Sequence, residues 1–467
     1  TCLSPPVSLQ AATISTTTAA SCWPSLPAPD TLTYTAEKLA PRRELVSWAM
    51  YDFANSGYTT VVLTAIFNAW FVSMLTSEAA NGNSGAGTLY WSIAVGIANT
   101  LILLSAPVLG AIADYSAAKK KILAFVTFGC ILLTGMLAFS DADRLLFTMI
   151  CLVGSAFFFG SGENLIASFL PEIAPPDHMG RVSGYSWALG YVGGLLVLGI
   201  CLAYIEYASG KGQSPDQYVP VTMWITAAVY ALAALPTFLF LRERSVPTAE
   251  TPTTAWKYVS IGFGRLKHTL QHRHRYRDLF RFLLALCVFS CGIYTVIVIA
   301  AIYAQQAMGF STADSIKMIM VVNITAAIGA FLFGKIQDVL GAKRTLVLTL
   351  LLWILAIAIA WQATTTTLFW ISANLIGIAM GSSQSAGRTL VGLFSPNGRN
   401  AEFFGLWGLS IKTAAIIGPM CYGLIAWYTQ GDHRQAILST LIFFVAGLVL
   451  LLTVNEGRGR HHAQLEQ

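Results

Sequence analysis

Charged residues are scarce in this sequence. Only 11% of the 467 residues are Asp, Glu, Lys or Arg, whereas a soluble domain usually carries about 25%. Hydrophobic residues make up 55% of the chain, and the mean hydropathy is +0.63. This composition excludes an ordinary water-soluble globular protein and indicates a membrane protein.

Catalytic and cofactor motifs are also lacking. The sequence has no G-x-x-x-x-G-K-[ST] phosphate loop, no H-E-x-x-H and no G-x-S-x-G motif, so neither ATP hydrolysis nor the common hydrolase chemistries are predicted. The eight cysteines lie mostly in apolar runs, where they act as small apolar filler. We weighed a metal site at His268, His272 and His274 but favour a basic helix on anionic lipid headgroups. We expect no enzyme activity, cofactor, resident metal or nucleic-acid partner.

Long apolar runs dominate what is present. A run of about 20 apolar residues spans the hydrocarbon core of a bilayer. The sequence predicts an all-α membrane protein with twelve transmembrane helices near 46–75, 90–113, 121–139, 145–170, 181–206, 219–241, 280–304, 315–337, 345–362, 368–391, 402–428 and 436–454.

The basic residues are distributed unevenly between the two sides of these spans. With both termini placed in the cytoplasm, nearly all of the 28 Lys and Arg residues fall on the cytoplasmic side. The exceptions are Arg144, Lys211, Lys317 and Arg434 outside, and Lys412 within a span. Such an asymmetry follows the positive-inside rule. We expect a multi-pass protein with both termini cytoplasmic, in the cell membrane, or in the vacuolar membrane if the source is fungal.

The two halves of the sequence resemble each other. GAIAD at 110–114 ends the second run and GKIQD at 334–338 ends the eighth, while GSGENLIA at 160–167 is matched at nearly the same spacing by GSSQSAGR at 381–388. Repeats with a substrate site between them are the architecture of secondary transporters. We expect five parts: a disordered tail at 1–45 that does not resemble a signal peptide, a six-helix bundle at 46–241, a basic cytoplasmic linker at 242–279, a second six-helix bundle at 280–455 and a cytoplasmic tail at 456–467.

A G-x-x-x-D motif followed by basic residues, found in both halves, resembles the major facilitator superfamily. The resemblance implies a cytoplasmic gate in which glycines allow close helix contact and carboxylates meet cations or a helix N-terminus. The implied gate residues are Gly110, Asp114, Lys119 and Lys120 in the first copy, and Gly334, Asp338, Gly341, Lys343 and Arg344 in the second. Tyr115 and Ala118 depart from the pattern in the first copy.

Three segments carry a narrower resemblance. WAMYDFANSGYTTVV, GRVSGYSWALGYVGG and AEFFGLWGLSIKTAAIIGP are similar to the autophagy-related vacuolar amino-acid effluxers and their bacterial relatives. This resemblance implies movement of a small solute, with amino acids the leading candidates. It also implies two rocking bundles around a cavity lined mainly by spans 1, 4, 7 and 10.

A few polar side chains lie inside predicted spans, where each charge costs at least ~2.5 kcal/mol. Asp52 lies about 9 Å into the first span at ~1.5 Å per residue, and Asn55 shares its helix face. Glu163 in the fourth span aligns with Gln384 in the tenth, so the acid belongs to one half only. Arg388 lies toward the cytoplasmic end of the tenth span, and Lys412 lies near the middle of the eleventh.

Three interpretations of these residues stay open. In the first, the charged residues form structural ion pairs. In the second, one of the acids titrates and couples transport to protons. In the third, Lys412 or Arg388 holds a solute carboxylate, while Asp52 or Glu163 binds the solute ammonium. A zwitterion suits the last arrangement, and Lys412 is the strongest single candidate. The competing functions are a transporter of a sugar, drug or lipid, a membrane enzyme acting on lipid, and a receptor that binds without transport. The sequence leaves the oligomeric state open.

Overall fold

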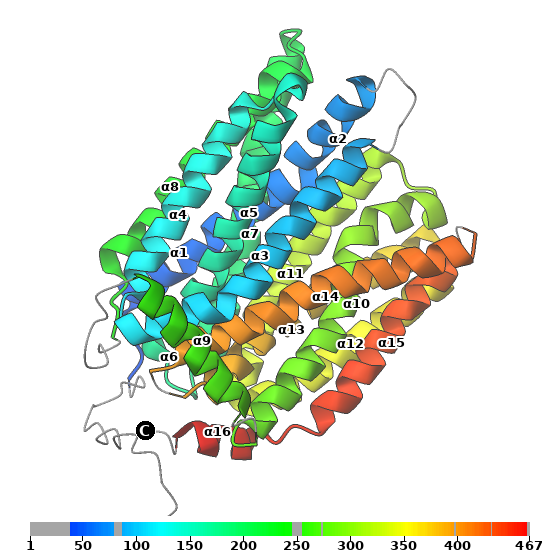
Figure 1. Ribbon diagram of the computed structural model, residues 1–467. Helices are drawn as coiled ribbons and strands as arrows, with labels where there is room; N and C mark the ends of the chain where they lie inside the picture. The colour runs from blue at the N-terminus through cyan, green and yellow to red at the C-terminus, as the bar shows by residue number, and fades with distance from the viewer. Residues whose placement is uncertain are drawn as a thin grey trace, which may run out of the picture. The chain divides into compact units, whose positions relative to one another are not determined.

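The computed structural model describes residues 38–78, 86–244, 255–271, 274–396, 398–430 and 432–464, all within the compact unit Thr33–Gln467. These residues are almost entirely helical (Figure 1). The α-helices are α1 (Arg42–Tyr58), α2 (Phe67–Glu78), α3 (Ala86–Ser116), α4 (Lys119–Met136), α5 (Leu145–Ala167), α6 (Leu170–Ile173), α7 (Met179–Gly210), α8 (Pro215–Phe240), α9 (Ala255–Gln271), α10 (Arg277–Met308), α11 (Thr312–Leu340), α12 (Ala342–Gln362), α13 (Thr366–Phe394), α14 (Asn400–Tyr428), α15 (His433–Leu452) and α16 (Glu456–Gln464).

Every predicted span coincides with a long helix, and its bounds fall within a few residues of the prediction. Within the described ranges, 11 helical segments are long and apolar enough to cross a membrane. The twelfth, α13, falls short of that composition because a polar run, Ser382–Ser385, and Arg388 interrupt it. The all-α prediction with twelve transmembrane helices is confirmed.

The first span departs from regular α-helix near its middle. Between α1 and α2 the chain forms a π-helix, Thr59–Ala65. The backbone N–H of Ile66 donates to the Val61 carbonyl at 3.0 Å. This bond reaches back five residues, which is the spacing of a π-helix, and such segments often occur at functional sites.

Helix contacts fall into two groups joined by two long interfaces. Helices α1, α3–α5, α7 and α8 contact one another, α10–α15 contact one another, and between the groups α3 packs along α14 and α7 along α11. Glycine makes both interfaces close. A Cβ on Gly110 would lie 2.0 Å from the Ala401 carbonyl oxygen of α14, and one on Gly184 would lie 2.6 Å from the Gly334 Cα of α11. The prediction that Gly110 and Gly334 permit close helix approach fits these contacts.

Two shorter helices, α9 and α16, lie at the lower end of the bundle in Figure 1. Helix α9 falls in the predicted linker and rests on α3, where Gly262 meets Val108. Its Thr269 donates to Glu402 of α14. Helix α9 therefore rests one face on the protein itself, rather than on lipid headgroups alone. Helix α16 begins in the predicted tail. The predicted tail 1–45 lies mostly outside the described residues, and the domain bounds stay a prediction.

Candidate functional site

A narrow cavity lies between the two helix groups, lined by residues of α5, α7, α10, α13 and α14. Its walls include Glu163, Trp187, Tyr294, Gln384 and Trp407. The volume that a water molecule can occupy is about 20 Å³, which is room for one water but not for an organic solute. A solute can therefore enter only after the helices move apart.

Glu163, on the wall of this cavity, forms an ion pair with Lys412, which follows the lining residue Ile411. The Lys412 ammonium on α14 lies 3.6 Å from a Glu163 carboxylate oxygen on α5, and 5.9 Å from the centre of the Phe159 ring. The pair is looser than a charge-assisted hydrogen bond, which measures about 2.7–2.9 Å. The Lys412 side chain is 12% exposed and the Glu163 side chain 24%. Two opposite charges from different helix groups are thus held close without a tight bond between them.

The cavity also presents polar groups from α7 and α13. The Tyr191 hydroxyl donates to the Gln384 side-chain oxygen at 2.8 Å. The indole N–H of Trp187 is buried and has no hydrogen-bond acceptor among the described residues. A buried donor without an acceptor is costly, so this group is available to a ligand. Sequence analysis gave Trp187 and Tyr191 no role, although both lie in the family segment GRVSGYSWALGYVGG.

Asp52 and Arg388 form a second pair between α1 and α13. The Arg388 guanidinium donates to the Asp52 carboxylate at 2.7 Å, and the Ser186 hydroxyl donates to the same oxygen at 2.6 Å. Arg388 also donates to the hydroxyl and carbonyl of Ser183, and its guanidinium lies over the Trp48 ring. The Arg388 side chain is only 2% exposed. This arginine is already fully engaged, unlike Lys412.

Asn55 points into the first helix group. Its side-chain oxygen accepts a hydrogen bond of 2.6 Å from the Tyr230 hydroxyl on α8, and Asn55 is buried. Residues of the cavity between the two groups do not include Asn55. The bond to Tyr230 does not favour the predicted solute contact of Asn55, which stays a prediction.

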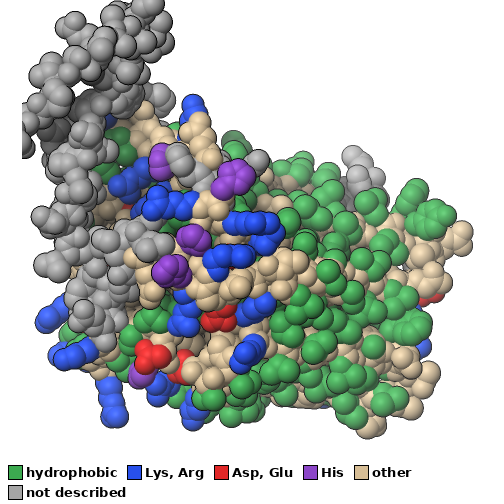
Figure 2. Space-filling view, turned by 90° about the horizontal axis from the view of Figure 1, so that it is seen from below, with side chains coloured by type: hydrophobic (Ala, Val, Ile, Leu, Met, Phe, Trp, Pro, Cys, Tyr) green, Lys and Arg blue, Asp and Glu red, His purple; other side chains and the backbone are tan. Residues whose placement is uncertain are grey.

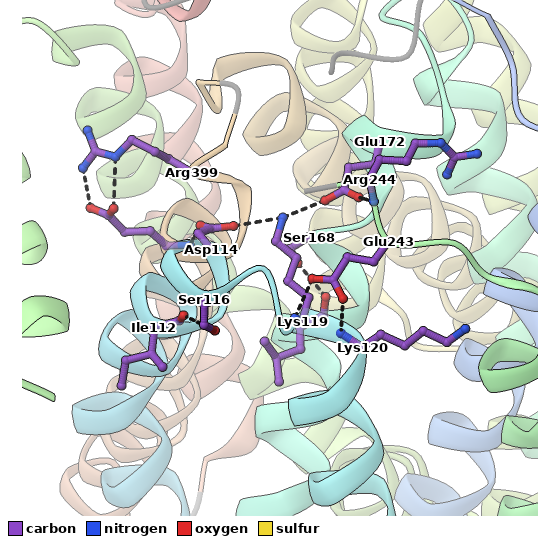
Figure 3. A network of polar contacts seen from close by, with 12 residues as sticks. Ile112, Asp114, Ser116, Lys119, Lys120, Ser168, Glu172, Glu243, Arg244 and Arg399 are labelled. Carbon is purple, nitrogen blue, oxygen red and sulfur yellow. Dashed lines mark hydrogen bonds and ion pairs between the residues drawn. The ribbon is translucent and has the colours of Figure 1, made fainter. Parts of the chain in front are cut away.

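The first copy of the gate motif forms a network of polar contacts (Figure 3), and Thr269 of α9 bonds to its Glu402. The Asp114 carboxylate pairs with the Lys119 ammonium at 2.9 Å, and Lys119 also bonds Glu172 at 2.6 Å. The second Asp114 oxygen accepts the backbone N–H of Glu402 at 2.8 Å, at the N-terminus of α14. Asp114 thereby closes α3 onto the positive end of a helix from the other group. Arg399 in turn binds the Glu402 side chain.

Two further carboxylates, Glu243 and Glu44, belong to this region. Glu243 accepts the backbone N–H groups of Lys119 and Lys120 at 2.7 and 3.1 Å, and so caps α4. Burial raises the pKa of Glu243, and those two N–H groups oppose the shift. The Arg244 guanidinium holds Glu44 through two bonds of 2.6 and 2.8 Å. The ammonium of Lys120 donates to the Leu241 carbonyl, so the expected contact of Lys120 with the gate is made by its backbone.

The second copy of the motif differs from the expectation. Asp338 pairs with Arg181 of α7 at 3.1 Å and accepts the Arg181 backbone N–H, so α7 supplies the cation. Gly341, Lys343 and Arg344 instead line an open pocket beside α16. Residue Gly341 ends α11 with a φ of 87°, where glycine is favoured. Lys343 directs its ammonium away to the Leu452 carbonyl. Asp338 therefore meets a cation from α7, and the gate role of Gly341, Lys343 and Arg344 stays a prediction.

Comparison with known proteins agrees with this architecture. The family model described as "Vacuole effluxer Atg22 like" matches residues 88–464. The chain belongs to this family. The "Uncharacterized MFS-type transporter YxiO" of Bacillus subtilis (strain 168) is 30% identical over 88% of this chain and 94% of its own. "Autophagy-related protein 22" of Yarrowia lipolytica is 26% identical over 63% of this chain, and the match spans 54% of that protein.

The fold of this Atg22-like chain is that of the major facilitator superfamily. The crystal structure of the human organic anion transporter MFSD10 (TETRAN) superposes with a TM-score of 0.68 at 15% identity, covering 88% of this chain and 99% of that one. The protein is a multi-pass membrane transporter of the Atg22-like family. The family model is described as an effluxer, and the Bacillus subtilis relative as a transporter.

Proposed function

We propose that this chain moves a small zwitterion, with amino acids the leading class, by alternating access between its two helix groups. The observation that carries the proposal is the loose Glu163–Lys412 pair, 3.6 Å apart, at a cavity between the groups. A zwitterion presents one ammonium and one carboxylate, and so offers each member of the pair a new partner of opposite charge. The orphaned Trp187 indole N–H supplies a further donor for the carboxylate.

The two ion pairs have different roles in this proposal. Arg388 is saturated by Asp52, Ser183 and Trp48, so it fastens α13 to α1 and α7 when the predicted cytoplasmic side is closed. Lys412 holds one loose partner, so it is the cation that a solute reaches. Aromatic rings on the cavity wall, Trp187, Tyr294 and Trp407, provide an apolar surface for the solute side chain.

Alternating access requires that the contacts closing the predicted cytoplasmic side can break. Asp114 joins α3 to α14, and Asp338 joins α11 to α7. Both links bind one helix group to the other at the end that carries α9 and α16. Because each link is charged and short, separating them requires a compensating gain, which solute binding and closure of the opposite side supply in an alternating cycle.

Purified protein in proteoliposomes tests the proposal through uptake of labelled amino acids. Loss of a charge-assisted contact of ~1.5–3 kcal/mol predicts that Lys412→Ala lowers transport roughly 10- to 150-fold, with the same amount of protein in the membrane. The matched control is Lys317→Ala, because Lys317 is 70% exposed and pairs with Asp314 at the surface. Such surface pairs contribute little, so that variant should transport normally.

The same vesicles test coupling and cargo. An imposed pH gradient that drives accumulation of the solute would show proton coupling, and labelled sugars, organic anions and lipids compete as alternative cargoes. Normal amino-acid flux by Lys412→Ala would refute the assigned role of Lys412. Binding without accumulation would favour a receptor.

A further inference from the structure

A second, open pocket lies at the surface of the second helix group, away from the central cavity. It has a volume of about 1050 Å³. Five cationic side chains and one carboxylate line it: Arg281, Lys343, Arg344, Arg458, Arg460 and Glu456. They come from the ends of α10, α12 and α16 that meet at the predicted cytoplasmic side. Figure 2 shows that end of the molecule, where Lys and Arg side chains gather next to an area of hydrophobic side chains.

Arg458 pairs with the Asp278 carboxylate at 2.5 Å, but Arg281, Lys343 and Arg344 form no ion pair with a residue that the structure describes. The Arg281 guanidinium donates to the Thr453 carbonyl at 3.4 Å, and the Lys343 ammonium donates to the Leu452 carbonyl at 3.2 Å. A neutral carbonyl accepts a hydrogen bond from each cation but does not neutralise its charge. Arg344 is exposed, and no described residue bonds its guanidinium. The Glu456 carboxylate lies 3.9 Å from Arg460, so it offsets one cation only weakly.

The first half has a related arrangement at the corresponding place. Glu456 accepts the Lys343 backbone N–H, just as Glu243 accepts that of Lys119. In the first half the Lys119 ammonium also meets Asp114 and Glu172. Lys120 makes the same pair of contacts as Lys343, a backbone bond to Glu243 and an ammonium bond to the Leu241 carbonyl, so the capping arrangement is present in both halves. In the second half an anion from outside the chain would supply a counter-charge for Arg281, Lys343 and Arg344.

An apolar groove continues from this pocket along the outer surface of α11 and α12. Leu340 and Leu348 line both the pocket and the groove. The other residues of the groove are Phe333, Lys335, Ile336, Val339 and Leu352, and its volume is about 560 Å³. Val339 is 84% exposed on a helix that lies in the bilayer. A basic pocket at the interface joined to an apolar groove in the bilayer matches the two ends of a lipid molecule.

We propose that this surface binds one anionic phospholipid, with its phosphate among Arg281, Lys343 and Arg344 and an acyl chain along the groove. Basic pockets between transmembrane helices on the cytoplasmic side suit such headgroups. The site is separate from the solute cavity and does not depend on the proposed cargo.

Native mass spectrometry of the detergent-solubilised protein with long-chain phosphatidic acid tests the site. The double variant Arg281→Gln/Arg344→Gln removes two uncompensated charges, and should weaken binding of the first lipid roughly 30-fold, equivalent to about 2 kcal/mol. The matched control, Arg42→Gln/Arg242→Gln, makes the same chemical change at two exposed positions of the first half and should bind as the wild type does. Equal binding by both double variants would overturn the proposal.

Further measurements distinguish headgroup binding from acyl-chain binding in the groove, and both from misfolding of the variants. Long-chain phosphatidic acid should bind more tightly than a soluble short-chain form, and inorganic phosphate should bind most weakly. If phosphate alone bound as tightly as the long-chain lipid, the surface would be an anion site and the groove would have no part. Thermal unfolding of both double variants in lipid-free detergent should match the wild type, and phosphatidic acid should raise the midpoint only where Arg281 and Arg344 are intact.

Discussion

Asp114→Ala should open the interface between α3 and α14 at the gate. The Asp114 carboxylate accepts the Glu402 N–H at 2.8 Å, and this N–H lies in the first turn of α14, where the helix itself offers no acceptor. The change removes a charge-assisted bond of ~1.5–3 kcal/mol and a favourable helix-terminus interaction of ~0.3–1 kcal/mol. Together these favour separation by about 2–4 kcal/mol, which is roughly 30- to 1000-fold in the open population.

Amide hydrogen exchange measures this shift directly, because local opening sets the exchange rate of protected amides. Peptides from the end of α3 and the start of α14 should exchange faster together in Asp114→Ala. Asp278→Ala is the matched control, since Asp278 is a buried aspartate that binds Arg458 within the second half. That variant should leave the α3–α14 interface protected. If Asp114→Ala lowered thermal stability while both segments kept wild-type exchange, Asp114 would be a structural residue and not a gate.

Two further variants separate stability from gating. Lys119→Met should destabilise the protein by about 3–5 kcal/mol, because it leaves Asp114 and Glu172 buried without their shared cation; an unchanged denaturation midpoint would contradict the network. The cycle of Asp52→Asn and Arg388→Gln should show a coupling energy of about 1.5–3 kcal/mol in thermal unfolding, as expected for a charge-assisted hydrogen bond; additive effects would mean that the pair contributes nothing as a pair.

Local features of the sequence were sufficient to predict the helices. Each apolar run became a helix within a few residues of its predicted bounds, because hydropathy and length decide membrane spans. The repeat also predicted something about the site. Glu163 and Gln384, which align between the halves, line the same cavity. An internal duplication places equivalent positions on opposite sides of a shared axis, so this pairing was within reach of the sequence.

Ion pairs between residues far apart in the sequence could not be predicted in the same way. Nothing local to Asp52 indicates Arg388, or local to Glu163 indicates Lys412, because these pairs depend on how the two helix groups meet. Arg181 of α7 supplies the cation for Asp338, and nothing local to either residue indicates this pair. Lys343 and Arg344 follow the motif in sequence but line the surface pocket beside α16.

The account depends most on Glu163 and Lys412 sharing one zwitterion. Isothermal titration with a transported amino acid, its decarboxylated amine and its deaminated acid tests this claim. The wild type should bind the amino acid at least tenfold more tightly than either analogue. Lys412→Met should lose the advantage of the amino acid over the amine, while Glu163→Gln should lose its advantage over the acid. Variants that both keep the wild-type order of affinities would contradict the claim that these two charges hold the solute.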